Sequence, residues 1–167
     1  MTNLEKFEYI TAHWYLHKGI VYSEHTRRPV AFANAKPLGH RYQAIKVGGR
    51  SGKYAIIYLH QAVYMLHYNK PIGEGMQIHH IDGNPLNNKP KNLIELTPAQ
   101  HRRIHTYQDK DPMRGISLYK GVWRFQWYDD NGNPQDKRFQ KLKDAKRFRA
   151  EIEEPRREEL RALGLDC

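Results

Sequence analysis

A dense run of turn-forming residues between two short apolar segments restricts the local folds open to this chain. Residues 82–90 read Asp-Gly-Asn-Pro-Leu-Asn-Asn-Lys-Pro, a composition typical of a loop. The apolar segments Met76–Ile81 and Leu93–Leu96 on either side predict two short strands. Thr97-Pro98-Ala99-Gln100 then combines an N-cap threonine, a proline at the first helical position and a glutamine at the third, which predicts a helix to about Tyr107. The predicted order is strand, long loop, strand and helix.

A small antiparallel sheet and a helix are predicted before this segment. Apolar stretches alternate with turn residues from residue 20 to residue 59, and the glycine-rich run at 48–52 is one of the turns. The expected strands are Ile20–Tyr22, Val30–Phe32, Tyr42–Val47 and Tyr54–Leu59. Apolar residues at 59, 62, 63 and 66 then follow the spacing of one helix face, and this helix should end before Pro71. Its expected role is to cover the sheet.

A second sheet with a helix is predicted after a polar linker. The linker is expected at residues 108–114, where Pro112 follows three charged residues. Asp130-Asn131-Gly132-Asn133 is a strong hairpin signal between two of the strands that follow. The expected strands are Ile116–Tyr119, Val122–Tyr128 and Lys137–Phe139. From Leu142 to Ile152 and beyond, the composition favours a helix.

The charge of the chain favours a polyanionic partner. The 167 residues include 28 Lys+Arg and 18 Asp+Glu, a formal net charge of +10, which points to nucleic acid first and an anionic membrane surface second. Residues 101–149 hold 13 basic and 6 acidic side chains, whereas residues 150–167 hold 3 and 6. The single cysteine, Cys167, excludes an internal disulfide and a cysteine-based zinc site. No secretion signal or membrane span is recognisable, so we expect a soluble protein of the cytoplasm.

Four of the ten histidines form a pattern that indicates chemistry. His79 and His80 end the first predicted strand, and His101 and His105 share one face of the helix that follows. Neighbouring strand residues point to opposite faces, so one of the first pair could bind a metal ion while the other acts in catalysis. A purely structural four-histidine zinc site is the alternative. His60 is expected to be buried or hydrogen-bonded near this site, and the remaining histidines are assigned no role.

The run from His79 to Leu93, followed by His101-Arg102-Arg103-Ile104-His105, resembles the HNH (ββα-metal) endonuclease motif, in particular that of phage and homing-type enzymes. The resemblance covers about residues 40–106. It implies an α+β fold in which a small antiparallel sheet and a helix lead into a ββα-metal core at about residues 76–107. On this basis residues 1–107 are expected to form the HNH endonuclease domain.

The resemblance also implies a role for individual residues. His80 would be the general base that deprotonates the attacking water, and Asn92 would brace the loop and orient His80. His79 and His101 would be metal ligands, with His105 as a possible third. One divalent metal ion per chain is implied, Mg²⁺ first and Zn²⁺ or Mn²⁺ as alternatives. Many homing-type relatives carry Asp and Asn where this chain has His79 and His101, and imidazole ligands widen the choice of metal.

Residues 115–155 resemble an AP2-type DNA-binding domain, a three-stranded sheet backed by one helix, and residues 156–167 are expected to be an acidic tail. Along the central strand, Trp123, Phe125 and Trp127 alternate with polar residues, so we expect the aromatic face to pack on the helix and the polar face to meet DNA. The candidate DNA contacts on this module and on the preceding helix are Arg102, Arg103, Arg124, Gln126, Lys137 and Arg138.

The sequence therefore predicts a metal-dependent endonuclease that nicks or cuts double-stranded DNA, acting as a monomer or homodimer with no obligate protein partner and no membrane association. Hydrolysis of a phosphodiester needs a water made nucleophilic near neutral pH, which a histidine with a pKa of about 6.5 can supply. The main alternative is a DNA-binding protein that keeps the HNH fold only as a structural metal unit. A protein that binds or cuts RNA is a third reading that the charge leaves open.

Overall fold

A computed structural model describes residues 1–34, 42–48 and 54–165. The chain divides into two compact units, Met1–Thr97 and Pro98–Cys167. This boundary falls before the helix of the predicted ββα segment, whereas the sequence placed the domain boundary after residue 107. Most of the predicted turn at residues 48–52 lies outside the described residues.

The first unit opens with a helix and a strand that the sequence analysis did not assign, followed by a strand that it predicted at Ile20–Tyr22. Helix α1 (Asn3–His13) begins at a capping box in which the Thr2 hydroxyl accepts from the Glu5 backbone and the Glu5 carboxylate accepts from the Thr2 backbone. Strand β1 (Trp14–His17) then pairs antiparallel with β2 (Ile20–Ser23). The Thr2-x-x-Glu5 spacing is a signal that sequence reasoning could have used.

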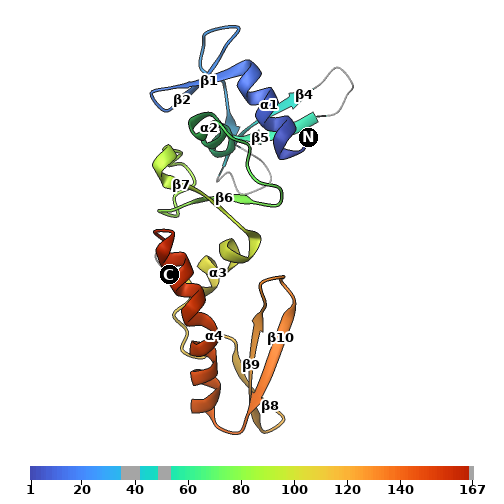
Figure 1. Cartoon of the computed structure of the whole chain (residues 1–167), viewed down its shortest axis with the longest axis vertical. Helices are drawn as coiled ribbons and strands as arrows, with labels where there is room; N and C mark the ends of the chain where they lie inside the picture. The colour runs from blue at the N-terminus through green and yellow to red at the C-terminus, as the bar shows by residue number, and fades with distance from the viewer. Residues whose placement is uncertain (35–41, 49–53, 166–167) are drawn as a thin grey trace. The chain divides into compact units, whose positions relative to one another are not determined.

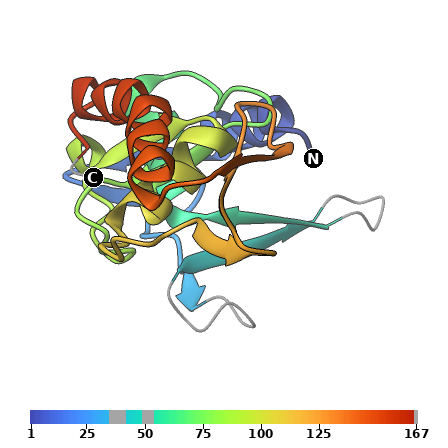
Figure 2. The same cartoon turned by 90° about the horizontal axis from the view of Figure 1, so that it is seen from below.

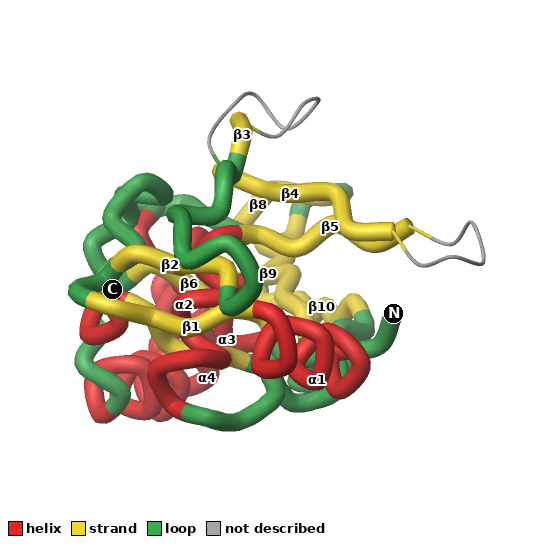
Figure 3. The backbone as a smooth tube through the Cα atoms, turned by 90° about the horizontal axis from the view of Figure 1, so that it is seen from above, coloured by secondary structure: helices red, strands yellow, loops and turns green. Residues whose placement is uncertain are grey.

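A three-stranded antiparallel sheet follows in the order β3-β4-β5, with strands β3 (Ala33–Asn34), β4 (Gln43–Gly48) and β5 (Tyr54–Tyr58). Figure 3 shows these strands as one layer. The strand predicted at Val30–Phe32 is wrong, because the Phe32 N–H donates to the Val30 carbonyl at 3.1 Å and closes a tight turn there. The strand begins only at Ala33.

Helix α2 (Leu59–Tyr68) starts where the sequence predicted and lies in the core of the first unit. Its residues Ala62, Val63 and Met65 are fully buried. Two short strands complete this unit, β6 (Gln77–His80) and β7 (Leu93–Leu96), and they pair antiparallel with each other. The loop that connects them contains the one-turn helix η1 (Pro90–Asn92). These strands match the two predicted around the turn-forming run.

The second unit contains the predicted sheet and two helices. Helix α3 (Pro98–Gln108) comes first, followed by an antiparallel sheet of order β10-β9-β8. The strands are β8 (Ile116–Tyr119), β9 (Val122–Tyr128) and β10 (Pro134–Phe139). Helix α4 (Leu142–Ala162) lies along one face of the sheet (Figures 1 and 2). Phe125 and Ala145 are buried between them, which confirms the aromatic face of β9 as core.

Helix α4 continues through Pro155 to Ala162, as the composition favoured, and so includes much of the stretch expected as an acidic tail at residues 156–167. Within this stretch Leu160 and Leu165 are buried. Among the described residues, no helix combines the length and apolar character that a bilayer crossing requires.

Candidate functional site

The end of β6 and the loop after it hold one of the predicted catalytic residues. His80 is the last residue of β6, lies opposite Leu93 in β7 and is only 5% exposed. Its ring Nε2 is 2.9 Å from the side-chain oxygen of Asn88 in the loop. The ring of His80 is therefore anchored at one nitrogen by a loop residue to which the sequence analysis gave no role.

The side chain of Asn92 makes three hydrogen bonds within this loop. Its side-chain oxygen accepts from the Asp82 N–H at 3.1 Å, and its amide donates at 2.8 Å both to the Asp82 carboxylate and to the Asn87 carbonyl. Asp82 also accepts from the Asn87 side chain and the Asn84 N–H. Hydrogen bonds from Asn87, Asn84 and Asn92 lower the pKa of Asp82 to about 2, so it remains a carboxylate. The bonds of Asn92 hold the loop, while the ring of His80 is held by Asn88.

Aromatic rings from other parts of the first unit also contact His80. The His60 ring from α2 meets the His80 ring edge to face at 5.2 Å, and the Tyr42 ring lies 6.1 Å from His80. Tyr58 stacks on His60 at 5.5 Å. Burial, followed by the neighbouring His80 and Lys6, lowers the pKa of His60 to about 3, so this ring is neutral at physiological pH. The expectation that His60 is buried near the site is confirmed; the two tyrosines carried no local sequence signal.

The three predicted metal ligands lie on two elements. His79 is on β6 and is buried. His101 and His105 are one turn apart on α3, with ring centroids 5.1 Å apart; His101 is half-buried and His105 is exposed. Burial and the adjacent His105 lower the pKa of His101, which favours the neutral imidazole that metal coordination requires.

The uncovered face of the second sheet carries three of the predicted DNA-contact residues. Arg124 on β9 lies opposite Arg138 on β10, and Gln126 follows two residues later with an exposed side chain. Both guanidinium groups lie over the ring of Tyr119 from β8, Arg124 at 4.6 Å and Arg138 at 5.4 Å from its centroid. The ring therefore brings two cations together on the face that α4 does not cover.

Lys137 is directed toward the opposite face. It pairs with the buried Phe125 across β9 and β10, and its ammonium lies 4.1 Å from the centroid of Phe148 on α4. This geometry follows from the strand alternation, since Lys137 and Arg138 are neighbours on one strand. Lys137 is thus separated from the arginines with which it was grouped.

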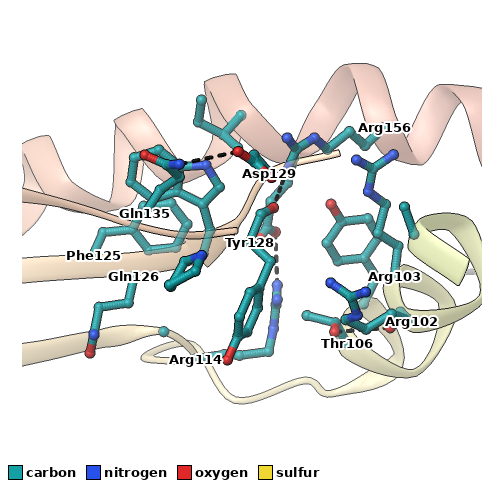
Figure 4. Close-up of a pocket in the computed structure, with 17 residues that line it drawn as sticks. Arg102, Arg103, Thr106, Arg114, Phe125, Gln126, Tyr128, Asp129, Gln135 and Arg156 are labelled. Carbon is teal, nitrogen blue, oxygen red and sulfur yellow. Dashed lines mark hydrogen bonds and ion pairs between the residues drawn. The ribbon is translucent and has the colours of Figure 1, made fainter. Parts of the chain in front are cut away.

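Arg102 and Arg103 of α3 line a pocket of about 340 Å³ in the second unit, together with residues of β9 and α4 (Figure 4). Arg103 is bound by the carboxylates of Asp130 and Glu159, and its side chain is 11% exposed. Arg102 has no ion pair among the described residues, and its guanidinium lies 5.4 Å from the centroid of Tyr128. Of the two, Arg102 has its charge available to a ligand.

Part of the chain is similar to known proteins. A family model described as HNH endonuclease matches residues 57–103. The chain is also similar to a solved structure described as DNA binding and cleavage by the HNH homing endonuclease I-HmuI, with a TM-score of 0.42 and 20% sequence identity over 75% of this chain and 71% of that chain. The sequence matches no curated protein.

The matched stretch runs from the end of β5 into α3 and contains six of the predicted site residues, namely His79, His80, Asn92, His101, Arg102 and Arg103. His105 lies just outside it. Residues 57–103 of this chain are therefore similar in sequence to HNH endonucleases.

Proposed function

We propose that this protein is a metal-dependent endonuclease that hydrolyses phosphodiester bonds in double-stranded DNA. The observation that carries the proposal is the HNH endonuclease match over residues 57–103, in which a strand, a braced loop, a strand and a helix present the histidines in order. A structural metal unit would have no use for His80, whose ring contacts a separate set of partners beside a potential ligand.

His80 is the general base in this proposal. Its Nε2 is engaged by Asn88, so its Nδ1 is the nitrogen that takes the proton from the attacking water. The loop network of Asn92 and Asp82 keeps Asn88 in place and so preserves the direction of the ring. Base and loop form one unit within residues 77–96.

His79, His101 and His105 would hold the metal ion. Imidazole donors suit Zn²⁺ and similar transition metals better than Mg²⁺, which prefers oxygen. When bound, the ion supplies positive charge that stabilises the developing negative charge on the phosphate and on the departing 3′ oxygen.

The second unit would position the enzyme on DNA as an AP2-like module. Its support is the uncovered sheet face with Arg124, Gln126 and Arg138, because a sheet can enter a groove and these side chains can reach base edges or phosphates. Arg102 would add a phosphate contact from α3, while Arg103 serves structure through Asp130 and Glu159.

One catalytic site per chain makes a nick the simplest product, and two chains or two events would be needed for a double-strand break. Monomer and homodimer both agree with this proposal. A phage origin and a homing role stay predictions from the resemblance.

The test is cleavage of supercoiled plasmid by the purified full-length protein in EDTA, Mg²⁺, Mn²⁺ or Zn²⁺, with His80→Ala alongside. We expect metal-dependent nicking that His80→Ala lowers by at least about 10³-fold, while its DNA affinity in a gel-shift assay stays within about twofold. His25→Ala is the matched control, because His25 is exposed and lies outside the loop and the histidine group.

Two results would overturn the proposal. Salt-sensitive DNA binding without cleavage under every metal would make this a DNA-binding protein that uses the HNH fold structurally. Preferential binding or cleavage of RNA would show that the substrate is RNA and not double-stranded DNA.

A further inference from the structure

In the loop between β6 and β7, Asn88 contacts the ring of His80, and this contact bears on which ring nitrogen carries the proton. This inference rests on the proposed function, in which His80 is the general base. His80 is 5% exposed, and its Nε2 lies 2.9 Å from the Asn88 side-chain oxygen. A buried polar ring atom without a partner destabilises the fold, so this bond constrains the ring strongly.

The direction of the Asn88 amide determines which of its atoms faces His80. Its nitrogen donates to the Leu86 carbonyl at 3.5 Å, and the Asn88 backbone N–H donates to the same carbonyl at 3.1 Å. The amide oxygen is therefore the atom turned toward the ring. Because this oxygen only accepts hydrogen bonds, the Nε2 of the neutral His80 ring must carry the proton.

A neutral imidazole has one protonated and one unprotonated nitrogen. With the proton on Nε2, the lone pair is on Nδ1, which is the atom a general base needs. The other rings near His80 do not disturb this state with charge, since burial lowers the pKa of His60 to about 3 and that ring is neutral. The Asn88 contact thus decides both the tautomer and the direction of the basic nitrogen.

Asn92 acts one step further from the ring. Its amide donates to the Asn87 carbonyl at 2.8 Å, directly before Asn88, and to the Asp82 carboxylate. Asp82 in turn accepts from the Asn87 side chain at 2.7 Å. The network holds both the side chain and the carbonyl of Asn87, and so it fixes the position of the backbone that leads into Asn88.

We propose that Asn88 is the positioning residue for His80, holding it as the Nε2–H tautomer with Nδ1 open to the attacking water, and that Asn92 supports this contact through Asn87. The sequence analysis gave the orienting role to Asn92 itself. In the structure this task is divided between two asparagines of the same loop.

The test compares wild type, Asn88→Leu and Asn88→Asp in the full-length protein. Leu has nearly the size of Asn without an acceptor, whereas Asp keeps an acceptor oxygen at the same distance. Nitrogen-15 NMR of histidine-labelled protein, with the His80 signals assigned by their loss in His80→Ala, reports which ring nitrogen carries the proton. Single-turnover cleavage and DNA affinity are measured on the same samples, and Asn131→Leu, in an exposed turn, is the control substitution.

We expect the Nε2–H tautomer in wild type and Asn88→Asp, and loss of this preference in Asn88→Leu. Cleavage should fall about 10- to 100-fold in Asn88→Leu with DNA affinity unchanged, and Asn88→Asp should recover most of it. An Nδ1–H tautomer in wild type would overturn the inference even if Asn88→Leu did not fold. Undiminished cleavage by a folded Asn88→Leu would also overturn it.

The two proposals fail in different ways. A wild-type protein that never cleaves DNA, but whose His80 tautomer depends on Asn88, would refute the nuclease and leave the assignment of the ring supported. Full cleavage in both Asn88 variants would refute the positioning role and leave the nuclease standing.

Discussion

The side chain of Asn92 makes three hydrogen bonds within the loop between β6 and β7, and all three end on Asp82 or Asn87. We expect Asn92→Ala to lower the free energy of unfolding of the first unit by about 2 kcal/mol, because it leaves a backbone donor and acceptors without partners. Cleavage should fall at least about tenfold, since Asn88 loses its support. Chemical denaturation and plasmid nicking measure the two effects.

Asn131→Ala serves as the control for Asn92→Ala, because Asn131 lies in an exposed turn of the other unit. A small change in stability combined with intact cleavage in Asn92→Ala would show that the loop holds its shape without this side chain.

His60 should make stability depend on pH. The pKa of His60 is about 3 in the folded protein, against 6.5 for an unperturbed histidine, so the unfolded chain binds more protons between these values. Stability is therefore lost as pH falls below 6.5, by about 2 kcal/mol at pH 5 from this group alone. His60→Phe keeps an aromatic ring and removes the titration.

Urea unfolding at pH 7 and pH 5 measures this prediction. We expect the difference between the two pH values to shrink by about 2 kcal/mol in His60→Phe compared with wild type. An unchanged difference would mean that other groups produce the acid sensitivity, and that His60 is more hydrated than its 8% exposure indicates.

At the scale of elements, the β8–β10 sheet separates its cations by face, and this separation can be tested. Arg124→Ala with Arg138→Ala should weaken DNA binding about 10-fold or more, because both guanidinium groups lie on the uncovered face. Lys137→Ala is the matched control from the covered side, where the ammonium lies over Phe148. It should change DNA affinity by less than about twofold.

Fluorescence anisotropy with a duplex measures these affinities, and circular dichroism checks that the variants fold. Equal weakening by Lys137→Ala and by the arginine pair would contradict the assignment of the uncovered face. Such a result would indicate that the sheet attracts DNA only through its total charge.

The elements that local signals specify were predicted correctly. Helices α2 and α3 followed from apolar spacing and an N-cap pattern, and the β9–β10 hairpin followed from Asp130–Asn133. The prediction of a strand at residues 30–32 was wrong, because the hydrogen bond from the Phe32 N–H to the Val30 carbonyl turns the chain there. An apolar run in the sequence does not reveal such a bond. The helix predicted from Leu142 to Ile152 and beyond was also correct, since α4 runs to Ala162.

The site divides in the same way. Its histidines were singled out by their spacing, and Asn92 by the resemblance to the HNH motif. Asn88 and Tyr42 were not identified, because their contacts with His80 depend on how the loop folds and on a residue distant in the chain. Local sequence predicts the reactive groups better than the groups that orient them.

At the scale of the whole molecule, the net charge of +10 predicts a strong effect of salt on DNA binding. Each phosphate neutralised by a cation contributes about −0.9 to the slope of log affinity against log salt concentration. Contacts from Arg102, Arg124 and Arg138 alone predict a slope of about −3, and replacing the two sheet arginines should reduce it by about two. Affinity measured over a series of salt concentrations gives this slope, and a value near zero would contradict an electrostatic role.

In the proposed DNA-binding role of the second unit, the length of β9 limits the number of base pairs that this strand can contact. Its seven residues extend over about 23 Å at about 3.3 Å each, which equals the rise of about seven base pairs. A sequence of about seven base pairs recurs by chance about once in 16,000 base pairs, so many copies compete within any large genome. Recognition of a single target site would therefore require a second set of DNA contacts along the duplex, and a footprint longer than about seven base pairs would reveal them.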